Sequence, residues 1–255
     1  MVEIIPLYPQ PVLLITKDDK KYMAISDLHI GIESSYLGKG IRIDSTYAYK
    51  QMTEQIADII KKNQIYGIIL LGDIKSSVAY INNYERKIIP EFLNAISCHA
   101  KVYLVPGNHD GGLDKILPNN INLISSIGLN IDDTLLTHGH CLPPISRSSV
   151  KSIIIGHVHP TFYKKDSVLN GESVWVYLKV RKASIFPQNK GILDIIVIPA
   201  FNNLCQVKER TTQPRQHSIS PIINRILSND SILSTIIVTL DGYVVGDNLM
   251  LQNIV

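Results

Sequence analysis

Short apolar runs separated by polar turns recur along the first 160 residues. Uninterrupted runs predict strands buried on both faces, and they cover residues 67–71, 101–105 and 152–155. Pairs of runs joined by a polar turn predict hairpins, and they cover residues 11–17 with 21–26 and 127–131 with 134–137.

Between these runs, two stretches place apolar side chains at helical spacing. Residues 45–63 predict an amphipathic helix with Ser45 as the N-cap. Residues 84–97 predict a second helix, in which Pro90 must lie in the first turn or cause a kink. The glycine-containing stretch 31–44 predicts a loop. Helices that alternate with strands predict a layered α/β fold, and the hairpins predict mixed sheets.

After Pro160 the pattern changes to half-exposed strands and a polar excursion. Further strands are predicted over residues 172–180, 192–199 and 234–240. Residues 208–221 are polar and rich in helix breakers, which predicts a mobile connection. We expect one domain over residues 1–255, in which 1–160 carries the chemistry described below and 161–255 completes a second sheet.

Composition narrows the class of protein. The 255 residues are 45% hydrophobic and 18% charged, which excludes a disordered or fibrous chain. The net charge of +3 says little about nucleic acid. Three cysteines without CxxC spacing disfavour a disulfide framework or a thiolate zinc site. No signal peptide is apparent, and no apolar run approaches the ~20 residues that cross a bilayer. We therefore expect a soluble cytoplasmic protein without a membrane partner.

Five short motifs follow apolar runs of the first 160 residues. They are Asp27-Leu28-His29, Gly72-Asp73, Gly107-Asn108-His109-Asp110, Thr137-His138-Gly139-His140 and Gly156-His157-Val158-His159. Each one alone fits an ordinary turn or a solvated loop end. All five in this order, each after a predicted strand, instead indicate a two-metal phosphoesterase, because imidazole, carboxylate and amide oxygen together suit a borderline divalent ion.

The spacing of these residues suggests how two ions would be held. In extended backbone, side chains at i and i+2 share one face, so those of Asp27-x-His29 and His157-x-His159 can each converge on an ion. The carboxylate of Asp73 can bridge two ions, which imidazole cannot. A hydroxide between two ions ~3.5–4 Å apart would attack the phosphorus. His109 is the candidate acid for the leaving oxygen, and Asp110 is a candidate to orient it.

On these motifs the chain resembles the calcineurin-like metallophosphoesterase superfamily. The resemblance spans residues 26–160 and implies a four-layer αββα sandwich with two mixed sheets. It also implies that Asp27, His29 and His159 hold one ion. Asn108, His138 and His157 hold the other ion, and Asp73 bridges the two. His109 would act as the acid.

The segments SDLHIGIE, GDIK, GHVHP and IPAFN resemble a narrower branch, the phosphoesterases related to the SbcD DNA-repair nucleases and the ligase-associated ones. That resemblance implies a phosphodiesterase or nuclease acting on DNA or RNA, with manganese as the expected ion and iron, zinc, cobalt or nickel as alternatives. Any ATPase partner would be a separate chain, because no P-loop is present. A homodimer is a further expectation. Lys75 and His140 are candidate substrate contacts, and basic residues near 179–182 and 208–215 are candidate nucleic-acid contacts.

Two alternatives remain open at this stage. The same catalytic residues would serve a phosphomonoesterase or a cyclic-nucleotide phosphodiesterase acting on small substrates. An inert binding module is less favoured, because each expected ligand and His109 are present.

Overall fold

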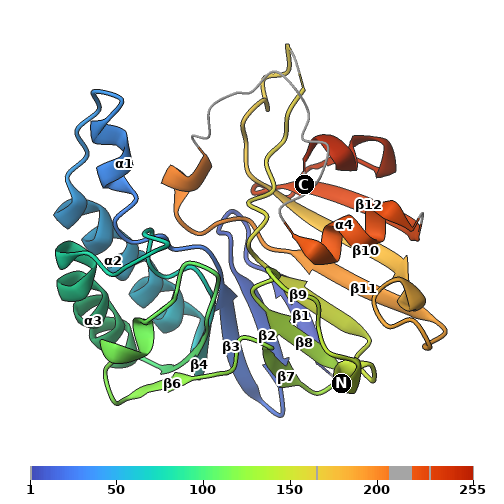
Figure 1. Cartoon of the computed structure of the whole chain (residues 1–255), viewed down its shortest axis with the longest axis horizontal. Coiled ribbons are helices and arrows are strands. Elements are labelled where there is room, and N and C mark those ends of the chain that lie inside the picture. The colour runs from blue at the N-terminus through green and yellow to red at the C-terminus, as the bar shows by residue number, and fades with distance from the viewer. Residues whose placement is uncertain (1, 165, 207–219, 230, 255) are drawn as a thin grey trace.

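A computed structural model describes residues 2–164, 166–206, 220–229 and 231–254, and within them the strands form two sheets (Figure 1). The first sheet has the order β1-β2-β3-β4-β5-β6. Its strands β3 to β6 run parallel, and β1 and β2 add an antiparallel edge. The bounds are β1 Glu3–Pro6, β2 Leu13–Lys17, β3 Lys20–Ile25, β4 Gly67–Leu71, β5 Lys101–Val105 and β6 Ile121–Leu123.

The second sheet has the order β13-β12-β10-β11-β9-β8-β7. Its strands β8, β9 and β11 are parallel, and its other pairs are antiparallel. Both sheets are therefore mixed. The bounds are β7 Leu129–Ile131, β8 Thr134–Thr137, β9 Ser152–Ile155, β10 Val174–Arg181, β11 Ile192–Val197, β12 Ile232–Thr239 and β13 Val244–Gly246.

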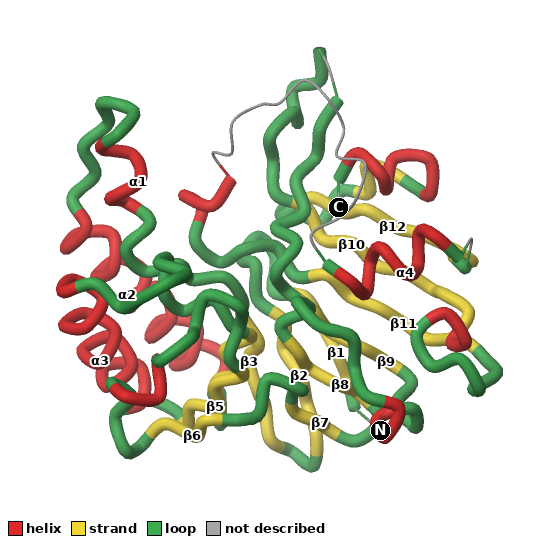
Figure 2. Tube along the Cα trace, viewed as in Figure 1, coloured by secondary structure: helices red, strands yellow, loops and turns green. Residues whose placement is uncertain are grey.

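Three hydrophobic cores show how the layers are stacked. The first core joins β3 and β4 to helices α2 (Ser45–Asn63) and α3 (Asn83–Ser97). The second lies between the two sheets, where Trp175 and Leu71 are fully buried. The third joins the second sheet to α4 (Pro221–Ser228) and the C-terminal 3-10 turn (Asn248–Asn253). Helices thus cover the outer faces of two packed sheets, as Figure 2 shows, which confirms the predicted four-layer α/β fold.

Most predicted elements are present, with local corrections. Helix α2 has the predicted bounds, but its N-cap is Asp44, whose carboxylate accepts from the amides of Thr46 and Tyr47. Helix α3 continues through Pro90, which lies in its interior and not in its first turn. The predicted loop 31–44 contains a short helix, α1 (Glu33–Leu37). Residues 207–219 of the predicted mobile connection lie outside the described part of the chain.

The arrangement of parallel strands determines where the motifs meet. The five motifs follow β3, β4, β5, β8 and β9, which are parallel strands of one sheet or the other. The carboxyl ends of parallel strands lie at one edge of a sheet, where loops can carry a functional site. Loops from both sheets therefore meet at one edge of the sandwich.

Candidate active site

Backbone conformation at this edge differs from the extended geometry expected from the i, i+2 spacing. Asp27, His29, Asp73, His157 and His159 have φ between 41° and 66°. This left-handed region is uncommon for residues other than glycine and clusters at functional sites. The side chains converge because the chain turns sharply past each strand end, so the prediction of extended backbone was wrong.

Glycines of the motifs bring backbone from different strands into close contact. Neither Gly107 nor Gly156 has positive φ, so a left-handed backbone conformation does not require glycine at these positions. A Cβ on Gly107 would lie 2.2 Å from Oδ1 of Asp73, and one on Gly156 would lie 1.6 Å from Oγ of Ser26. Because Ser26 follows β3 and Gly156 follows β9, the glycine allows the two sheets to approach at the site.

Asp73 lies at the centre of the cluster and is nearly fully buried. Its Oδ2 is 3.6 Å from Nε2 of His29, 3.3 Å from Nε2 of His138 and 3.8 Å from Nε2 of His109. Its Oδ1 accepts a hydrogen bond from the amide of His109 at 2.9 Å. A single carboxylate therefore lies between imidazoles contributed by both sheets, which is the arrangement that a bridging ligand requires.

His138 and Asn108 form one side of the cluster. Nδ1 of His138 donates to the carbonyl of Leu71 at 2.7 Å, so in the neutral ring the lone pair lies on Nε2. That nitrogen lies 3.3 Å from Oδ1 of Asn108. Burial lowers the pKa of His138, but its hydrogen bond with Asp73 and the charge of Asp27 outweigh burial and raise it to about 9. A positive charge is thus favoured at this position, as a divalent ion would supply.

The carboxylate of Asp27 lies on the other side and is fully buried. Its Oδ2 accepts from the Ser26 hydroxyl at 2.6 Å and from the His157 amide at 3.0 Å. Its Oδ1 makes no hydrogen bond among the described residues, although Nε2 of His159 lies 3.0 Å away. Burial raises the pKa of Asp27, but the nearby imidazoles, that of His159 first, hold it well below its usual range. This oxygen and Nε2 of His159 together fit two ligands of one metal ion.

His29 completes the same side. Its Nε2 lies 3.3 Å from Nε2 of His159, a separation compatible with two ligands of one ion. Burial lowers the pKa of His29 to about 4, which outweighs the opposing effect of Asp27 and Asp73. A neutral ring keeps a lone pair for a cation. Ligand atoms of Asp73, His138 and His157 likewise lie within 4.8 Å of one another. The structure thus brings the seven predicted ligands together, and the donor set fits divalent metals.

His109 is held where a proton donor would be useful. Nδ1 of its ring donates to the carbonyl of Ser76 at 2.6 Å, and its side chain is 23% exposed. The other nitrogen, Nε2, faces Asp73 on the side of the cluster. The ring therefore has a fixed orientation and an open approach, which suits contact with a leaving group.

A family comparison decides the class of this site. The family model for the calcineurin-like phosphoesterases matches residues 20–183, well over half of the chain. The chain belongs to the calcineurin-like phosphoesterase family. It is a metal-dependent hydrolase of phosphate esters. The roles of individual residues stay predictions.

Solved structures give further similarities to this phosphoesterase. It is similar to the nuclease MPE of Pseudomonas putida (16% identity over 79% of this chain and 88% of that chain, TM-score 0.49). It is also similar to Yfce, a phosphoesterase from E. coli (13% identity, 90% and 98% covered, TM-score 0.39). A third similarity is to an archaeal phosphodiesterase (20% identity, 69% and 98% covered, TM-score 0.33). No curated protein matches the chain.

Lys75 does not lie where it could contact a substrate. Its side chain is fully buried in the phosphoesterase. Its ammonium donates to the carbonyls of Ser77 and Val78, the latter at 3.4 Å. The prediction of a phosphate contact was wrong, because this lysine satisfies backbone carbonyls of its own loop.

Asp110 contacts the backbone instead of the ring of His109. Its Oδ2 accepts from the amide of Gly107 at 2.8 Å, and its Oδ1 accepts from the amides of Ile74 and Lys75 at 2.8 and 3.3 Å. Burial raises the pKa of Asp110, against the effect of the Gly107 hydrogen bond. The orienting group for His109 is the Ser76 carbonyl, and Asp110 ties the Asp73 loop to the Asn108 loop.

The predicted substrate contact of His140 and the predicted nucleic-acid contacts of the basic segments differ in how the structure bears on them. The ring of His140 lies 5.3 Å from that of His138, beside the cluster, so a substrate contact stays a prediction. Lys179 pairs with Asp194 at 2.9 Å, and the buried ammonium of Lys182 donates to the carbonyl of Val150 at 2.5 Å. Both lysines therefore already have a hydrogen-bond or ion-pair partner within the protein. The basic residues 208–215 lie outside the described part of the chain.

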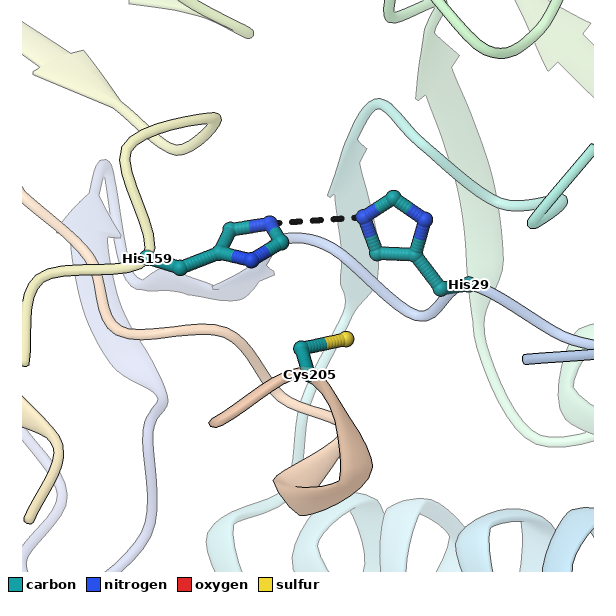
Figure 3. Close-up of side chains that lie close together, drawn as sticks. All are labelled: His29, His159 and Cys205. Atoms are coloured by element: carbon teal, nitrogen blue, oxygen red, sulfur yellow. Dashed lines mark hydrogen bonds between the residues drawn. The ribbon is translucent and has the colours of Figure 1, made fainter. Parts of the chain in front are cut away.

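Sequence reasoning missed Cys205, whose sulfur lies within 4.8 Å of ring nitrogens of both His29 and His159 (Figure 3). It also missed Asn202, whose side chain donates to the carbonyl of Leu28 at 2.8 Å. Residue spacing gave no signal for either, since Asn202 is 174 positions from Leu28 and Cys205 is 178 positions from its contact at Asp27. Among the described residues, no helix is long and apolar enough to span a bilayer.

Proposed function

We propose that the chain is a dinuclear metal-dependent phosphodiesterase that hydrolyses phosphodiester bonds of DNA or RNA. The position of Asp73 is the main support for a site with two metal ions. Its Oδ2 lies 3.6 Å from Nε2 of His29 and 3.3 Å from Nε2 of His138. These two imidazoles belong to different predicted ligand sets, so a carboxylate between them is placed to bridge two ions.

The residues divide into two predicted sets around this bridge. Asp27, His29 and His159 would hold one ion, and Asn108, His138 and His157 would hold the second. Two bound divalent ions would lower the pKa of a shared water and neutralise charge on the phosphate. Two carboxylates among seven ligands leave the loaded site positive, which favours an anionic substrate.

His109 supplies the proton donor in this proposal. Its Nδ1 proton is committed to the Ser76 carbonyl, so the reacting proton is carried on Nε2. Oδ2 of Asp73 lies 3.8 Å from that nitrogen. The donor would protonate the oxygen that leaves phosphorus, which matters most for the poor alkoxide leaving group of a nucleic acid.

Preference for a nucleic-acid diester rests on the narrower sequence resemblance carried by SDLHIGIE, GDIK, GHVHP and IPAFN. The last of these segments packs on the first motif: the amide of Phe201 donates to the carbonyl of Ser26 at 2.8 Å. Two segments that share the resemblance therefore form one structural unit at the site, which is consistent with a common function.

A substrate panel tests the proposal. Manganese-loaded protein should cleave bis-p-nitrophenyl phosphate and single-stranded DNA faster than p-nitrophenyl phosphate. The Asp73→Ala variant serves as the background control for contaminating nucleases. Cleavage of the monoester alone would refute the diesterase assignment in favour of a phosphomonoesterase.

A further inference from the structure

The thiol of Cys205 lies beside the predicted first metal position. Its Sγ and one ring nitrogen each of His29 and His159 lie within 4.8 Å of one another. Cys205 is 3% exposed and comes from the 3-10 turn Asn203–Gln206, on a different segment from the two histidines (Figure 3). Two imidazoles and a buried thiol form a donor set that metal sites use.

Hydrogen bonds fix the segment that carries this cysteine against the first motif. The side chain of Asn202 donates to the carbonyl of Leu28 at 2.8 Å and accepts from the amide of Leu204 at 3.0 Å. The amide of Cys205 donates to the carbonyl of Asn202 at 3.0 Å. On the other side, the hydroxyl of Tyr36 donates to the carbonyl of Leu204. The thiol therefore has a fixed position relative to His29.

The distances allow the thiol and both imidazoles to share one ion. At a tetrahedral zinc ion, a zinc–sulfur bond of ~2.3 Å and a zinc–nitrogen bond of ~2.0–2.1 Å place the two donors about 3.6 Å apart. Since Sγ and the nitrogens lie within 4.8 Å of one another, a shift of at most about 1.2 Å brings them to this separation. The His29 and His159 nitrogens, 3.3 Å apart, already fit neighbouring positions on an ion.

We propose that Cys205 is a protein ligand of the ion held by Asp27, His29 and His159, and that it makes this position selective for zinc over manganese. The inference rests on the proposed function for the metal position itself. On binding, the sulfur forms a bond to the ion, its S–H bond breaks and the proton passes to solvent. Thiolate is a soft ligand that favours zinc, whereas the oxygen and imidazole set of Asn108, His138 and His157 accepts manganese. The two positions thus differ in the ion that they prefer.

Cobalt provides a spectroscopic test that needs no catalysis. Full-length protein loaded with cobalt should show a near-ultraviolet thiolate-to-cobalt charge-transfer band. The band should persist in Cys98→Ser and Cys141→Ser, which are matched controls at the other two cysteines. It should disappear in Cys205→Ser, while visible cobalt bands show that ions are still bound. A wild-type protein with bound cobalt and no charge-transfer band would overturn the proposal.

Zinc affinity provides a second, independent readout. Competition with a chromophoric chelator should show that Cys205→Ser weakens the tighter zinc site by at least the roughly 10-fold that loss of a supporting group costs. Manganese affinity should change little, so the zinc-to-manganese preference falls. Unchanged zinc affinity would contradict the proposal. If Cys205→Ser does not fold, the wild-type and control spectra decide. A wild type that shows the band but cleaves no diester refutes only the proposed function.

Discussion

Substitution of Gly156 by alanine tests whether the two sheets must touch at the site. The new Cβ would lie 1.6 Å from Oγ and 2.6 Å from Cβ of Ser26, and 2.7 Å from Oδ2 of Asp27. The serine hydroxyl can rotate away, but its Cβ cannot. Ordinary contact begins at 3.4 Å, so the ends of β3 and β9 must separate by several tenths of an ångström.

That separation affects both stability and metal binding. Overpacking of this kind costs ~1–3 kcal/mol and occasionally more. For a chain of this size the melting temperature should fall by roughly 2–12 °C, at ~2–4 °C per kcal/mol. The amide of His157 donates to Asp27 across the same contact at 3.0 Å, so the two halves of one metal position would also move apart. Metal content after reconstitution should therefore fall below that of the wild type.

Gly111→Ala is the matched control, because a Cβ there meets nothing within 4 Å and the residue has no positive φ. Its melting temperature and metal content should equal those of the wild type. Adding Ser26→Gly to Gly156→Ala removes the two nearest atoms and should recover part of the lost stability, with a coupling of ~0.5–3 kcal/mol. If Gly156→Ala melts and binds metal like Gly111→Ala, the close approach of the two sheets is not required and the reasoning fails.

Three further variants and metal removal separate the roles of the site. Asp73→Ala should lose the paired ions and the activity, with metal content measured by mass spectrometry. An Asp73→Ala variant that keeps two ions and full diesterase activity would exclude a bridging role. His109→Ala should keep its metals while kcat for DNA falls ~10²–10⁴-fold. The loss of kcat should be smaller for bis-p-nitrophenyl phosphate, because its leaving group needs less protonation. An equal loss of kcat on both substrates would argue against an acid role for His109. Lys75→Met should lower the free energy of unfolding by ~1–3 kcal/mol, because two carbonyls lose their donor. KM for the diester should not change, and a raised KM would instead support a substrate contact by Lys75. Chelation should abolish activity but preserve the circular-dichroism spectrum, and added manganese or zinc should restore turnover; unfolding on chelation would mean that the ions hold the loops in place.

Sequence predicted local elements well where the apolar pattern was continuous. The bounds of β4, β5, β9 and α2 agree with the prediction, because each run ends at a change in residue character. The hairpin of β7 and β8 was also predicted. The short edge strands β1, β6 and β13 were missed, since three or four residues give too little periodicity. Which strands pair within each sheet was not predictable either. For example, β9 pairs with β8 but also with β11, which begins far along the chain at Ile192.

Residue type was a good guide to the metal cluster and a poor guide to its surroundings. Each motif alone fits an ordinary turn, but all five in this order after predicted strands identified the seven candidates, and the structure brings them together. Residue type was misleading for Lys75, because a lysine side chain is expected in solvent. Its burial depends on two backbone carbonyls that no sequence pattern reveals. Cys205 is similar, since hydrogen bonds between residues far apart in the sequence, such as those of Asn202 with Leu28 and of Tyr36 with Leu204, bring it to His29.

The left-handed residues of the cluster are supported by backbone hydrogen bonds between the motif loops. Such conformations cost of order 1–3 kcal/mol each and persist only when the surrounding structure determines them. Here the amides of Asp27 and His29 donate to the carbonyls of Gly72 and Asp73 at 3.1 and 2.9 Å, so one metal loop holds the other. The amide of Phe201 adds a third hydrogen bond at the carbonyl of Ser26. Backbone pairing between loops that follow different strands therefore supports the left-handed residues, and this pairing ties the positions of the predicted metal ligands to the fold.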